Sequence, residues 1–321
     1  MNILANDGIS PNGLQALQAA GHTVHTDFIE ADALEAFING HGIDGLLVRS
    51  ATKVRQPLID ACPTLKFIGR GGVGMDNIDV EYARRKGITV FNTPASSSQS
   101  VAELVMGHLF ALSRFLNESF AAMPTRGASD FKALKKAYGK GVELRGKRLA
   151  IVGMGRIGQS LATYALGAGM DVVGVDRESG TCPVTWEIGG TAVTVKVPLV
   201  SMEEALATAD AISLHIPAQA GGGAVIGAEQ FASMKDGVLL VNAARGGVVD
   251  EDALLAALDS GKVRAAGLDV FVGEPAPRAD VLAHPRVAAT PHIGAATVEA
   301  QGRIGLEIAE IVSHLASEVS A

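Results

Sequence analysis

Three residues in the second half of the sequence have side chains suited to proton and anion chemistry. They are Arg245, Glu274 and His292. An arginine can hold a carboxylate through two parallel hydrogen bonds. A histidine can take or return the proton of a hydroxyl group, and a glutamate beside it can fix its tautomer and stabilise the imidazolium. The set therefore suits a reaction in which a hydroxyl group loses or gains a proton beside a bound carboxylate.

Each of these three residues lies in a loop that follows a predicted strand. In an open parallel sheet, the crevice that takes ligands lies at the carboxyl ends of the strands. We therefore expect Arg245, Glu274 and His292 to converge at one edge of such a sheet, although they are 29 and 18 residues apart in the chain.

A glycine-rich turn precedes these residues. Gly153, Gly155 and Gly158 form a G-x-G-x-x-G motif between an apolar strand and a helix, and Asp176 follows Gly158 by 18 residues. In this fingerprint the glycines permit a tight turn, a close approach of backbone to a pyrophosphate, and close packing of helix on strand. The helix N-terminus supplies N–H groups and the positive end of its dipole. The motif therefore predicts a dinucleotide cofactor.

Asp176 indicates which dinucleotide is bound. A carboxylate at this position accepts hydrogen bonds from the adenosine ribose hydroxyls and repels a 2′-phosphate, which favours NAD over NADP. Arg156 and Arg177 lie near enough in the sequence to weaken that preference.

The first ninety residues alternate short apolar runs with helical patterns, which predicts parallel βαβ units in one small α/β domain. The expected strands are Asn2–Ala5, His22–Thr26, Gly45–Val48, Lys66–Gly69 and Ile88–Phe91, and the expected helices include Pro11–Ala20, Ala31–Asn39 and Val80–Lys86.

The pattern then changes before a second α/β region begins at Arg148. Ser100 and Glu103 predict a capping box at the head of a long helix that ends near Phe120. Residues 122–147 are polar and contain glycines, and are expected to form a long surface connection. Residues 181–197 predict an extra hairpin. The other expected elements are strands Leu149–Val152, Met170–Val175, Ala211–His215, Val238–Val241 and Ala265–Leu268, and helices Arg156–Ala168, Met202–Thr208, Glu251–Ser260 and one from after His292 to about Ser317.

Length and composition limit the class of protein. A chain of 321 residues predicts about two domains. The net charge of −7 argues against a nucleic-acid-binding protein. Cys62 and Cys182 exclude a disulfide framework and a C-x-x-C metal or redox pair. The N-terminus does not resemble a signal peptide, and no apolar stretch is long enough to span a membrane. We therefore expect a cytoplasmic protein with no bound metal, no nucleic-acid partner and no membrane contact.

Eight stretches of the sequence carry the motifs of one family, and on them the chain resembles the D-2-hydroxyacid dehydrogenases over nearly all of its length. The stretches are Val48–Lys53, Arg70–Asp79, Asn92–Pro94, Ser100–Glu103, Gly153–Gly158, Asn242–Asp250, Gly267–Phe271 and Thr290–Thr297. Together they are far more specific than any one of them.

The resemblance implies an α/β fold of two doubly wound parallel-sheet domains around a cleft. A flavodoxin-like substrate-binding domain would comprise residues 1–98 and 293–321, and a Rossmann-type NAD-binding domain residues 99–292. Arg245, Glu274 and His292 match the family's catalytic residues. The implied cofactor contacts are Val73, Gly153, Gly155, Arg156, Ile157, Gly158, Asp176, Pro217, Ala243, Asp269, His292 and Gly294, with Val73 and Gly74 near the nicotinamide.

A group of cations in the N-terminal part bears on the substrate. Arg49 and Arg70 each follow an apolar strand, so parallel strands would place them at the same sheet edge. With Lys53 they would form a pocket for anionic substrate groups, although solvated surface charges are the alternative interpretation. The complete set expected at the substrate is Arg49, Ser50, Lys53, Arg70, Gly72, Val73 and Gly74.

The leading expectation is NAD-dependent oxidation of 3-phospho-D-glycerate to its 2-oxo acid, as in serine biosynthesis. A glyoxylate or hydroxypyruvate reductase shares the catalytic residues and differs only in the pocket. An NAD-sensing corepressor is a third hypothesis. A formate dehydrogenase is disfavoured, because that relative carries glutamine where Glu274 stands.

Several roles stay open on sequence alone. Asp269 either braces a loop or contacts the cofactor, and Ser100 is either a helix cap or a ligand. A homodimer is expected, and Lys135 and Lys136 would either reach a neighbouring active site or lie in a solvated loop. The resemblance stops short of the serine-sensing domain of some relatives, so feedback by that route is not expected. The glycine-rich run 218–224 is given no function.

Overall fold

The computed structural model describes residues 1–219 and 221–319. Two compact units make up the chain. Unit 1 comprises Met1–Ser98 and the residues from Ala295 onward, and unit 2 comprises Gln99–Gly294. The chain returns to unit 1 at Ala295, two residues after the predicted boundary at residue 293. Within the described residues, no helix has both the length and the apolar character needed to cross a bilayer.

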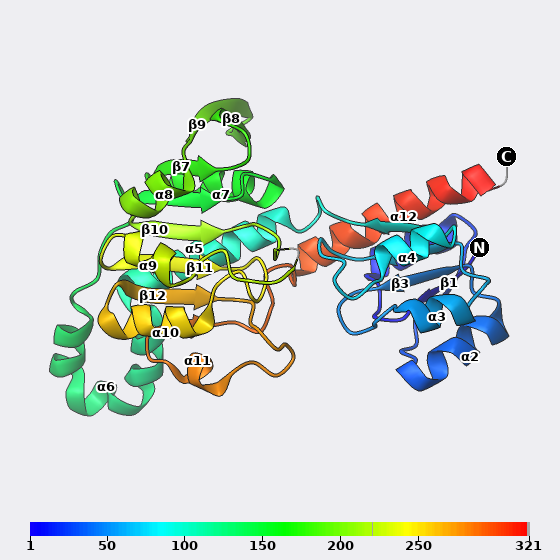
Figure 1. Cartoon of the computed structure of the whole chain (residues 1–321), viewed down its shortest axis with the longest axis horizontal. Coiled ribbons are helices and arrows are strands. Elements are labelled where there is room, and N and C mark those ends of the chain that lie inside the picture. Colours follow the sequence, from blue (N-terminus) through cyan, green and yellow to red (C-terminus); the bar gives the residue numbers. More distant parts are fainter. Residues whose placement is uncertain (220, 320–321) are drawn as a thin grey trace. The chain divides into compact units, whose positions relative to one another are not determined.

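Unit 1 is built on a five-stranded, wholly parallel sheet of order β2-β1-β3-β4-β5, which is the flavodoxin-like order (Figure 1). Each strand forms where the sequence predicts it, to within one residue at either end. The strands are β1 (Asn2–Ala5), β2 (Thr23–His25), β3 (Gly45–Val48), β4 (Phe67–Arg70) and β5 (Thr89–Asn92), and the helices are α1 (Pro11–Ala19), α2 (Ala31–His41), α3 (Gln56–Ala61), α4 (Val80–Arg85) and α12 (Val298–Val319).

Helices cover both faces of this sheet. One face packs with α2, α3 and α4, and the other with α1 and α12. The C-terminal helix belongs here because its predicted apolar stripe is buried against the sheet at Ile304, Ile308 and Val312. Gly13 and Gly305 let α1 and α12 approach closely, since a Cβ on Gly13 would lie 2.6 Å from the Gly305 Cα.

Unit 2 carries an eight-stranded sheet of order β13-β12-β11-β10-β6-β7-β9-β8, parallel except for the last pair. Its strands are β6 (Arg148–Val152), β7 (Asp171–Val175), β8 (Gly180–Ile188), β9 (Thr191–Leu199), β10 (Ala211–Leu214), β11 (Val238–Asn242), β12 (Val263–Leu268) and β13 (Val287–Ala289). Its helices are α5 (Ser98–Arg114), α6 (Leu116–Tyr138), α7 (Arg156–Gly167), α8 (Met202–Thr208), α9 (Ala228–Ser233), α10 (Glu251–Ser260) and α11 (Ala279–Ala283). The strands β7 to β9 are added on one side of β6 and the strands β10 to β13 on the other, so the order of addition reverses between β6 and β10, as in a doubly wound dinucleotide-binding sheet.

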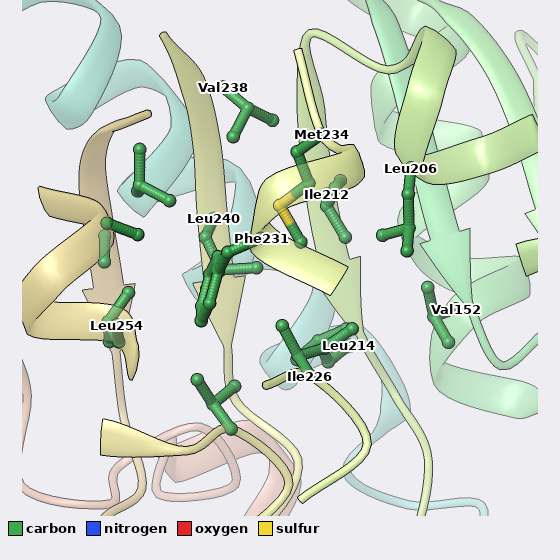
Figure 2. Close-up of a cluster of buried hydrophobic side chains, with 14 of the residues drawn as sticks. Val152, Leu206, Ile212, Leu214, Ile226, Phe231, Met234, Val238, Leu240 and Leu254 are labelled. Carbon is green, nitrogen blue, oxygen red and sulfur yellow. The ribbon is translucent and has the colours of Figure 1, made fainter. Parts of the chain in front are cut away.

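Two apolar layers enclose the sheet of unit 2. Side chains of α5 and α7 pack on one face, and those of α8, α9 and α10 on the other. Figure 2 shows the second layer, which includes Phe231 of α9, Leu254 of α10 and the strand residues Leu214 and Leu240. Both faces are buried, so the strands read as nearly continuous apolar runs.

The predicted hairpin is confirmed. Strands β8 and β9 pair antiparallel, and β9 also pairs with β7 at Gly174 and Leu199. Figure 1 shows the hairpin projecting from the sheet beyond β7. Every second residue of the hairpin is apolar, and Val184 and Val197 are buried in the same apolar layer as α7.

The prediction for residues 115–138 is wrong, whereas residues 139–147 form a connection as expected. The helix expected to reach Phe120 ends at Arg114, because Phe115 adopts a left-handed conformation with φ of 56°. Most of the expected surface connection is the helix α6, which continues through Pro124 and is kinked at Asp130. Its alanine and lysine residues are strong helix formers, and an ion pair of 3.1 Å joins Arg126 to Asp130. These outweigh the polar residues and glycine that suggested a loop.

The capping box is also wrong. The helix α5 begins at Ser98, so Ser100 lies inside its first turn and not at the N-cap. The Glu103 carboxylate instead accepts hydrogen bonds from the Gln99 amide and the Tyr164 hydroxyl. The elements α3, α9, α11 and β13 were not predicted, because each is six residues or shorter and carries little periodicity.

Candidate active site

The glycine-rich turn has the geometry that its motif predicts. Gly153 has φ of +99°, and a Cβ there would lie 2.5 Å from the His215 carbonyl oxygen. A Cβ on Gly158 would lie 2.1 Å from the Gly153 carbonyl oxygen, so the third glycine is required for packing. A Cβ on Gly155 would meet nothing within 4 Å. The second glycine therefore keeps a space open beside the backbone, as a bound pyrophosphate requires.

The helix α7 starts at this open space, and Gly155 is its N-cap. No side chain caps the helix among the described residues. Its first N–H groups, on Arg156 and Ile157, have no acceptor within the helix. A helix N-terminus of this kind is an anion site, so the turn fits the pyrophosphate of a dinucleotide.

Asp176 lies at the end of β7, beside the turn. Its Oδ2 accepts a hydrogen bond of 2.8 Å from the Met154 backbone N–H, and its Oδ1 accepts one of 2.7 Å from the Arg177 N–H. The side chain is exposed. Each carboxylate oxygen has a further lone pair, so the position still suits a ribose hydroxyl.

His215 follows β10, and its carbonyl oxygen lies against Gly153 of the glycine turn. Its Nε2 is 2.8 Å from the buried Ser213 hydroxyl oxygen, and its buried Nδ1 has no hydrogen-bond partner among the described residues. Burial lowers the pKa of His215 to about 4. The imidazole is therefore neutral near pH 7 and adds no positive charge beneath the turn.

The predicted acid–base pair is assembled. The His292 Nδ1 lies 2.8 Å from Glu274 Oε2, and Glu274 Oε1 accepts a hydrogen bond of 2.8 Å from the Phe271 N–H. Because an ionised carboxylate only accepts hydrogen bonds, Nδ1 carries the proton and Nε2 has a free lone pair. The His292 side chain is 47% exposed. Its Nε2 can therefore receive a proton from a substrate hydroxyl.

The loop that carries His292 is held by a buried carboxylate. Asp269 is 1% exposed. Its Oδ1 accepts hydrogen bonds from the Thr290 hydroxyl at 2.6 Å and the Ile293 N–H at 2.8 Å, and its Oδ2 accepts one from the Gly294 N–H at 2.8 Å. The bracing role of Asp269 is therefore present in the structure. The Gly294 N–H is already hydrogen-bonded to Asp269. A contact of Asp269 or Gly294 with the cofactor stays a prediction.

Arg245 lies in the loop after β11 and is half-buried. Its Nη1 donates to the Ala244 carbonyl at 2.6 Å, and the Asn242 side-chain amide donates to the Arg245 carbonyl at 3.0 Å. The next residue, Gly246, packs so tightly that a Cβ would lie 2.0 Å from the Phe271 carbonyl oxygen. The Arg245 loop thus packs on the loop that carries Glu274, and unit 2 brings all three catalytic candidates into adjoining loops.

Three residues that the sequence analysis did not single out support these loops. Glu251 is buried, and its Oε1 accepts a 2.9 Å hydrogen bond from the N–H of Val272, two residues before Glu274. Thr290 bonds to Asp269, and His108 lies behind Thr290. Thr290 lies within a family motif, whereas His108 carries no local sequence signal, since its partners are distant in the chain.

Two other cofactor candidates follow strands of the same sheet. Pro217 is exposed after β10, and Ala243 is partly buried after β11. The glycine-rich run begins one residue after Pro217. Its Gly221, Gly222 and Gly223 all have positive φ, while Ala220 in that run lies outside the described residues.

The substrate candidates of unit 1 lie at the ends of β3 and β4 and in the loops that follow, and hydrogen bonds hold the backbone of the first loop. The Asp7 carboxylate accepts hydrogen bonds from the Arg49 N–H at 2.6 Å and the Thr52 N–H at 3.1 Å. The Asn77 amide and the Arg70 Nε donate to the Arg49 carbonyl, at 3.0 and 3.3 Å. The backbone at Arg49 is thereby fixed on both sides.

Arg49 and Arg70 flank the same turn. A Cβ on Gly72 would lie 2.0 Å from Arg70 Nη1, and one on Gly71 would lie 3.6 Å from Arg49 Cγ. The remaining candidates lie on these two loops: Ser50, Lys53 and Val73 are exposed, and Gly74 is partly buried. No ion pair joins Arg49 or Lys53 to a carboxylate within the described residues.

Comparison with known proteins agrees with this geometry. The sequence profile of the family described as "D-isomer specific 2-hydroxyacid dehydrogenase, NAD binding domain" matches residues 106–294, the part that holds the glycine turn and Arg245, Glu274 and His292. The chain belongs to this family. Its members are NAD-dependent oxidoreductases of D-2-hydroxy acids, so the cofactor of the dehydrogenase is NAD.

The relatives carry two different names. The chain is 44% identical over 290 residues to a hydroxypyruvate reductase of Thermotoga maritima, which covers 89% of each chain. It is 41% identical over 312 residues to the D-3-phosphoglycerate dehydrogenase of Methanocaldococcus jannaschii, of which it spans 56%. Among solved structures, the TT0316 protein of Thermus thermophilus has a TM-score of 0.82 at 32% identity, covering 97% of this chain and 95% of that one.

The residues of unit 2 suit the family's reaction. Bound NAD would supply the nicotinamide that accepts or returns the hydride. His292 Nε2 would take the hydroxyl proton, and Glu274 would stabilise the resulting imidazolium through Nδ1. Arg245 would supply a cation for the substrate carboxylate.

Proposed function

We propose that the dehydrogenase oxidises 3-phospho-D-glycerate to 3-phosphooxypyruvate with NAD, as a step in serine biosynthesis. The observation that carries the proposal is the placement of Arg49 and Arg70 on either side of the Gly71–Gly72 turn, on a loop fixed by Asp7 and Asn77. This arrangement brings the side chains of two arginines to one turn.

The charge of the substrate explains why such a group is needed. A phosphorylated three-carbon acid is anionic at both ends, and Arg245 can neutralise only one of them. We assign the carboxylate to Arg245 of unit 2, and the phosphate to Arg49, Lys53 and Arg70 of unit 1. Gly72, Val73 and Gly74 add backbone groups next to these cations, and Ser50 adds a hydroxyl.

Steady-state kinetics of Arg49→Ala test the assignment. A hydrogen bond between charged groups contributes roughly 1.5–3 kcal/mol, or about ten- to a hundredfold in binding. The KM for 3-phosphoglycerate should therefore rise at least about tenfold, with little change for D-glycerate. Arg84→Ala is the matched control, because Arg84 is an exposed arginine of unit 1 paired with Glu81. Equal harm to both substrates would contradict the proposal.

A reductase acting on glyoxylate or hydroxypyruvate is the second candidate. The relative named hydroxypyruvate reductase, at 44% identity, favours it. Wild-type enzyme assayed with NADH would then prefer hydroxypyruvate over 3-phosphooxypyruvate. An NAD-sensing corepressor, the third hypothesis, would show no turnover with either acid.

We propose a homodimer formed through α5 and α6. Three phenylalanines on these helices are exposed: Phe110 by 47%, Phe120 by 69% and Phe131 by 60%. A second copy of the chain would cover them, and Lys135 and Lys136, on the same helix as Phe131, would then lie near the partner. Light scattering of the wild type and of Phe120→Ser with Phe131→Ser tests this. We place the enzyme in the cytoplasm, in line with its two free cysteines, Cys62 and Cys182.

A further inference from the structure

We propose that His108 is a positioning residue for the reaction, acting through Thr290 and Asp269 on the loop that carries His292. His108 lies on α5 and is 6% exposed. Its Nε2 is 3.3 Å from the Thr290 hydroxyl oxygen.

The direction of the hydrogen bonds follows from the number of protons available. The Thr290 hydroxyl has one proton, and it lies 2.6 Å from Asp269 Oδ1, which as a carboxylate oxygen can only accept. Thr290 must therefore accept its second hydrogen bond, and His108 must donate it. This places the His108 proton on Nε2.

The same carboxylate holds the catalytic loop. Asp269 accepts the N–H groups of Ile293 and Gly294, the two residues that follow His292. His292 itself has φ of 54°, a left-handed conformation that a non-glycine residue keeps only when its surroundings impose it. The relay from His108 through Thr290 to Asp269 therefore ends on the backbone that sets the position of the imidazole.

The strand β12 leaves room for the His108 ring because it has a glycine, Gly267, at the point of contact. A Cβ on Gly267 would lie 2.8 Å from the His108 Cγ and 2.9 Å from its Nδ1. Gly267 precedes Asp269 by two residues, so one strand both accommodates the ring and presents the carboxylate. Any larger side chain at position 267 would displace the ring from Thr290.

The charge state of His108 agrees with a donor role. Burial lowers the pKa of His108, while the negative charge of Asp269 opposes that shift. The ring is therefore neutral near pH 7, and it donates through Nε2 without adding a cation next to Asp269. A neutral donor leaves the Asp269 charge available to the Thr290 hydroxyl and the two N–H groups.

Two amide substitutions separate the hydrogen bond from the bulk of the side chain. His108→Gln places an N–H₂ group near the position of Nε2, whereas His108→Asn is too short to reach Thr290. We expect His108→Asn to lower kcat about three- to tenfold, in line with loss of one neutral hydrogen bond. His108→Gln should stay within about twofold of wild type. 3-Phosphooxypyruvate and NADH are the probe substrates, followed at saturating concentrations.

Two further measurements exclude a general structural effect. The KM for NADH should change little in His108→Asn, because the glycine turn is not involved. In a Thr290→Val background, the change from His108 to Asn should have no further effect on kcat, since the link is already cut. Should His108→Asn fail to fold, His108→Met replaces it as a donor-free side chain of similar bulk.

The inference rests on the acid–base role of His292, so His292→Ala is measured alongside. If His292→Ala retains near-normal turnover, that underlying role is wrong and the relay has nothing to position. If His292→Ala is inactive while His108→Asn matches wild type, the relay alone is overturned. An equal loss in His108→Gln and His108→Asn, or additive effects with Thr290→Val, also overturns it.

Discussion

Replacing Asp269 with asparagine is the most direct test of how this site is held. The carboxylate is 1% exposed and accepts three hydrogen bonds, from the Thr290 hydroxyl and from the Ile293 and Gly294 N–H groups. Asparagine has nearly the same shape but only one acceptor oxygen. If that oxygen serves Thr290 and Ile293, the new N–H₂ group points at the Gly294 N–H, and two donors face each other.

The magnitude follows from the number of bonds affected. A hydrogen bond to a charged group is worth roughly 1.5–3 kcal/mol, and a neutral one roughly 0.5–1.5 kcal/mol. The hydrogen bond from Gly294 to a charged acceptor is lost, and those from Thr290 and Ile293 become bonds to a neutral acceptor. With part of the strain relaxed, the total cost in free energy is about 3–5 kcal/mol. The affected segment is a surface loop, so most of this cost should appear as displacement of His292. Since each ~1.4 kcal/mol is tenfold in rate, we expect kcat to fall at least about a hundredfold.

The assay is NADH oxidation with 3-phosphooxypyruvate at 340 nm, together with calorimetric unfolding. Asp236→Asn is the control, because the Asp236 side chain is 91% exposed and paired only with Lys262 among the described residues. It should match wild type in both measurements. If Asp269→Asn keeps kcat within about threefold of wild type, the carboxylate does not hold the loop and the reasoning fails.

Three further predictions concern single residues. His292→Ala should lower turnover by ~10²–10⁴-fold and leave NADH binding, followed by fluorescence, nearly unchanged. Asp176→Ala should relax the preference for NAD over NADP, since Arg156 and Arg177 remain to meet a 2′-phosphate; an unchanged ratio of kcat/KM values would place Asp176 away from the ribose. The pKa of His215 falls from 6.5 to about 4 on folding, so the unfolded state binds its proton first as the pH drops. The free energy of unfolding should therefore decrease between pH 6.5 and pH 4, by up to about 3 kcal/mol, and a denaturant series with His215→Asn should show a shallower decrease.

Local chemistry in the sequence determined much of the fold. Short apolar runs between helical patterns predicted the parallel strands of both sheets except β9 and β13, because a strand buried on both faces must be apolar along its length. The three glycines at 153, 155 and 158 predicted the cofactor turn, since each is required for a backbone reason that no other residue meets. The hairpin after Asp176 was visible in the alternation of residues 191–197.

Helix boundaries were less well predicted where tertiary packing overrides local signals. Polar residues and glycines suggested a loop over residues 122–147, yet α6 includes Pro124 and Gly127 and ends only at Tyr138. Nothing local to Phe115 indicates the left-handed turn that separates α5 from α6. Such residues depend on what surrounds them in the folded unit, which a local pattern does not record.

The sequence also predicted Arg245, Glu274 and His292 as catalytic residues, from their residue types, their positions after strands and the family motifs that contain them. Only the tertiary structure showed how they are held. Asp269 and Thr290 are 21 residues apart, and His108 is 182 residues from Thr290. A hydrogen bond requires two atoms within about 3 Å and correctly oriented, and that condition is met by the packing of α5 on β12 rather than by any spacing along the chain.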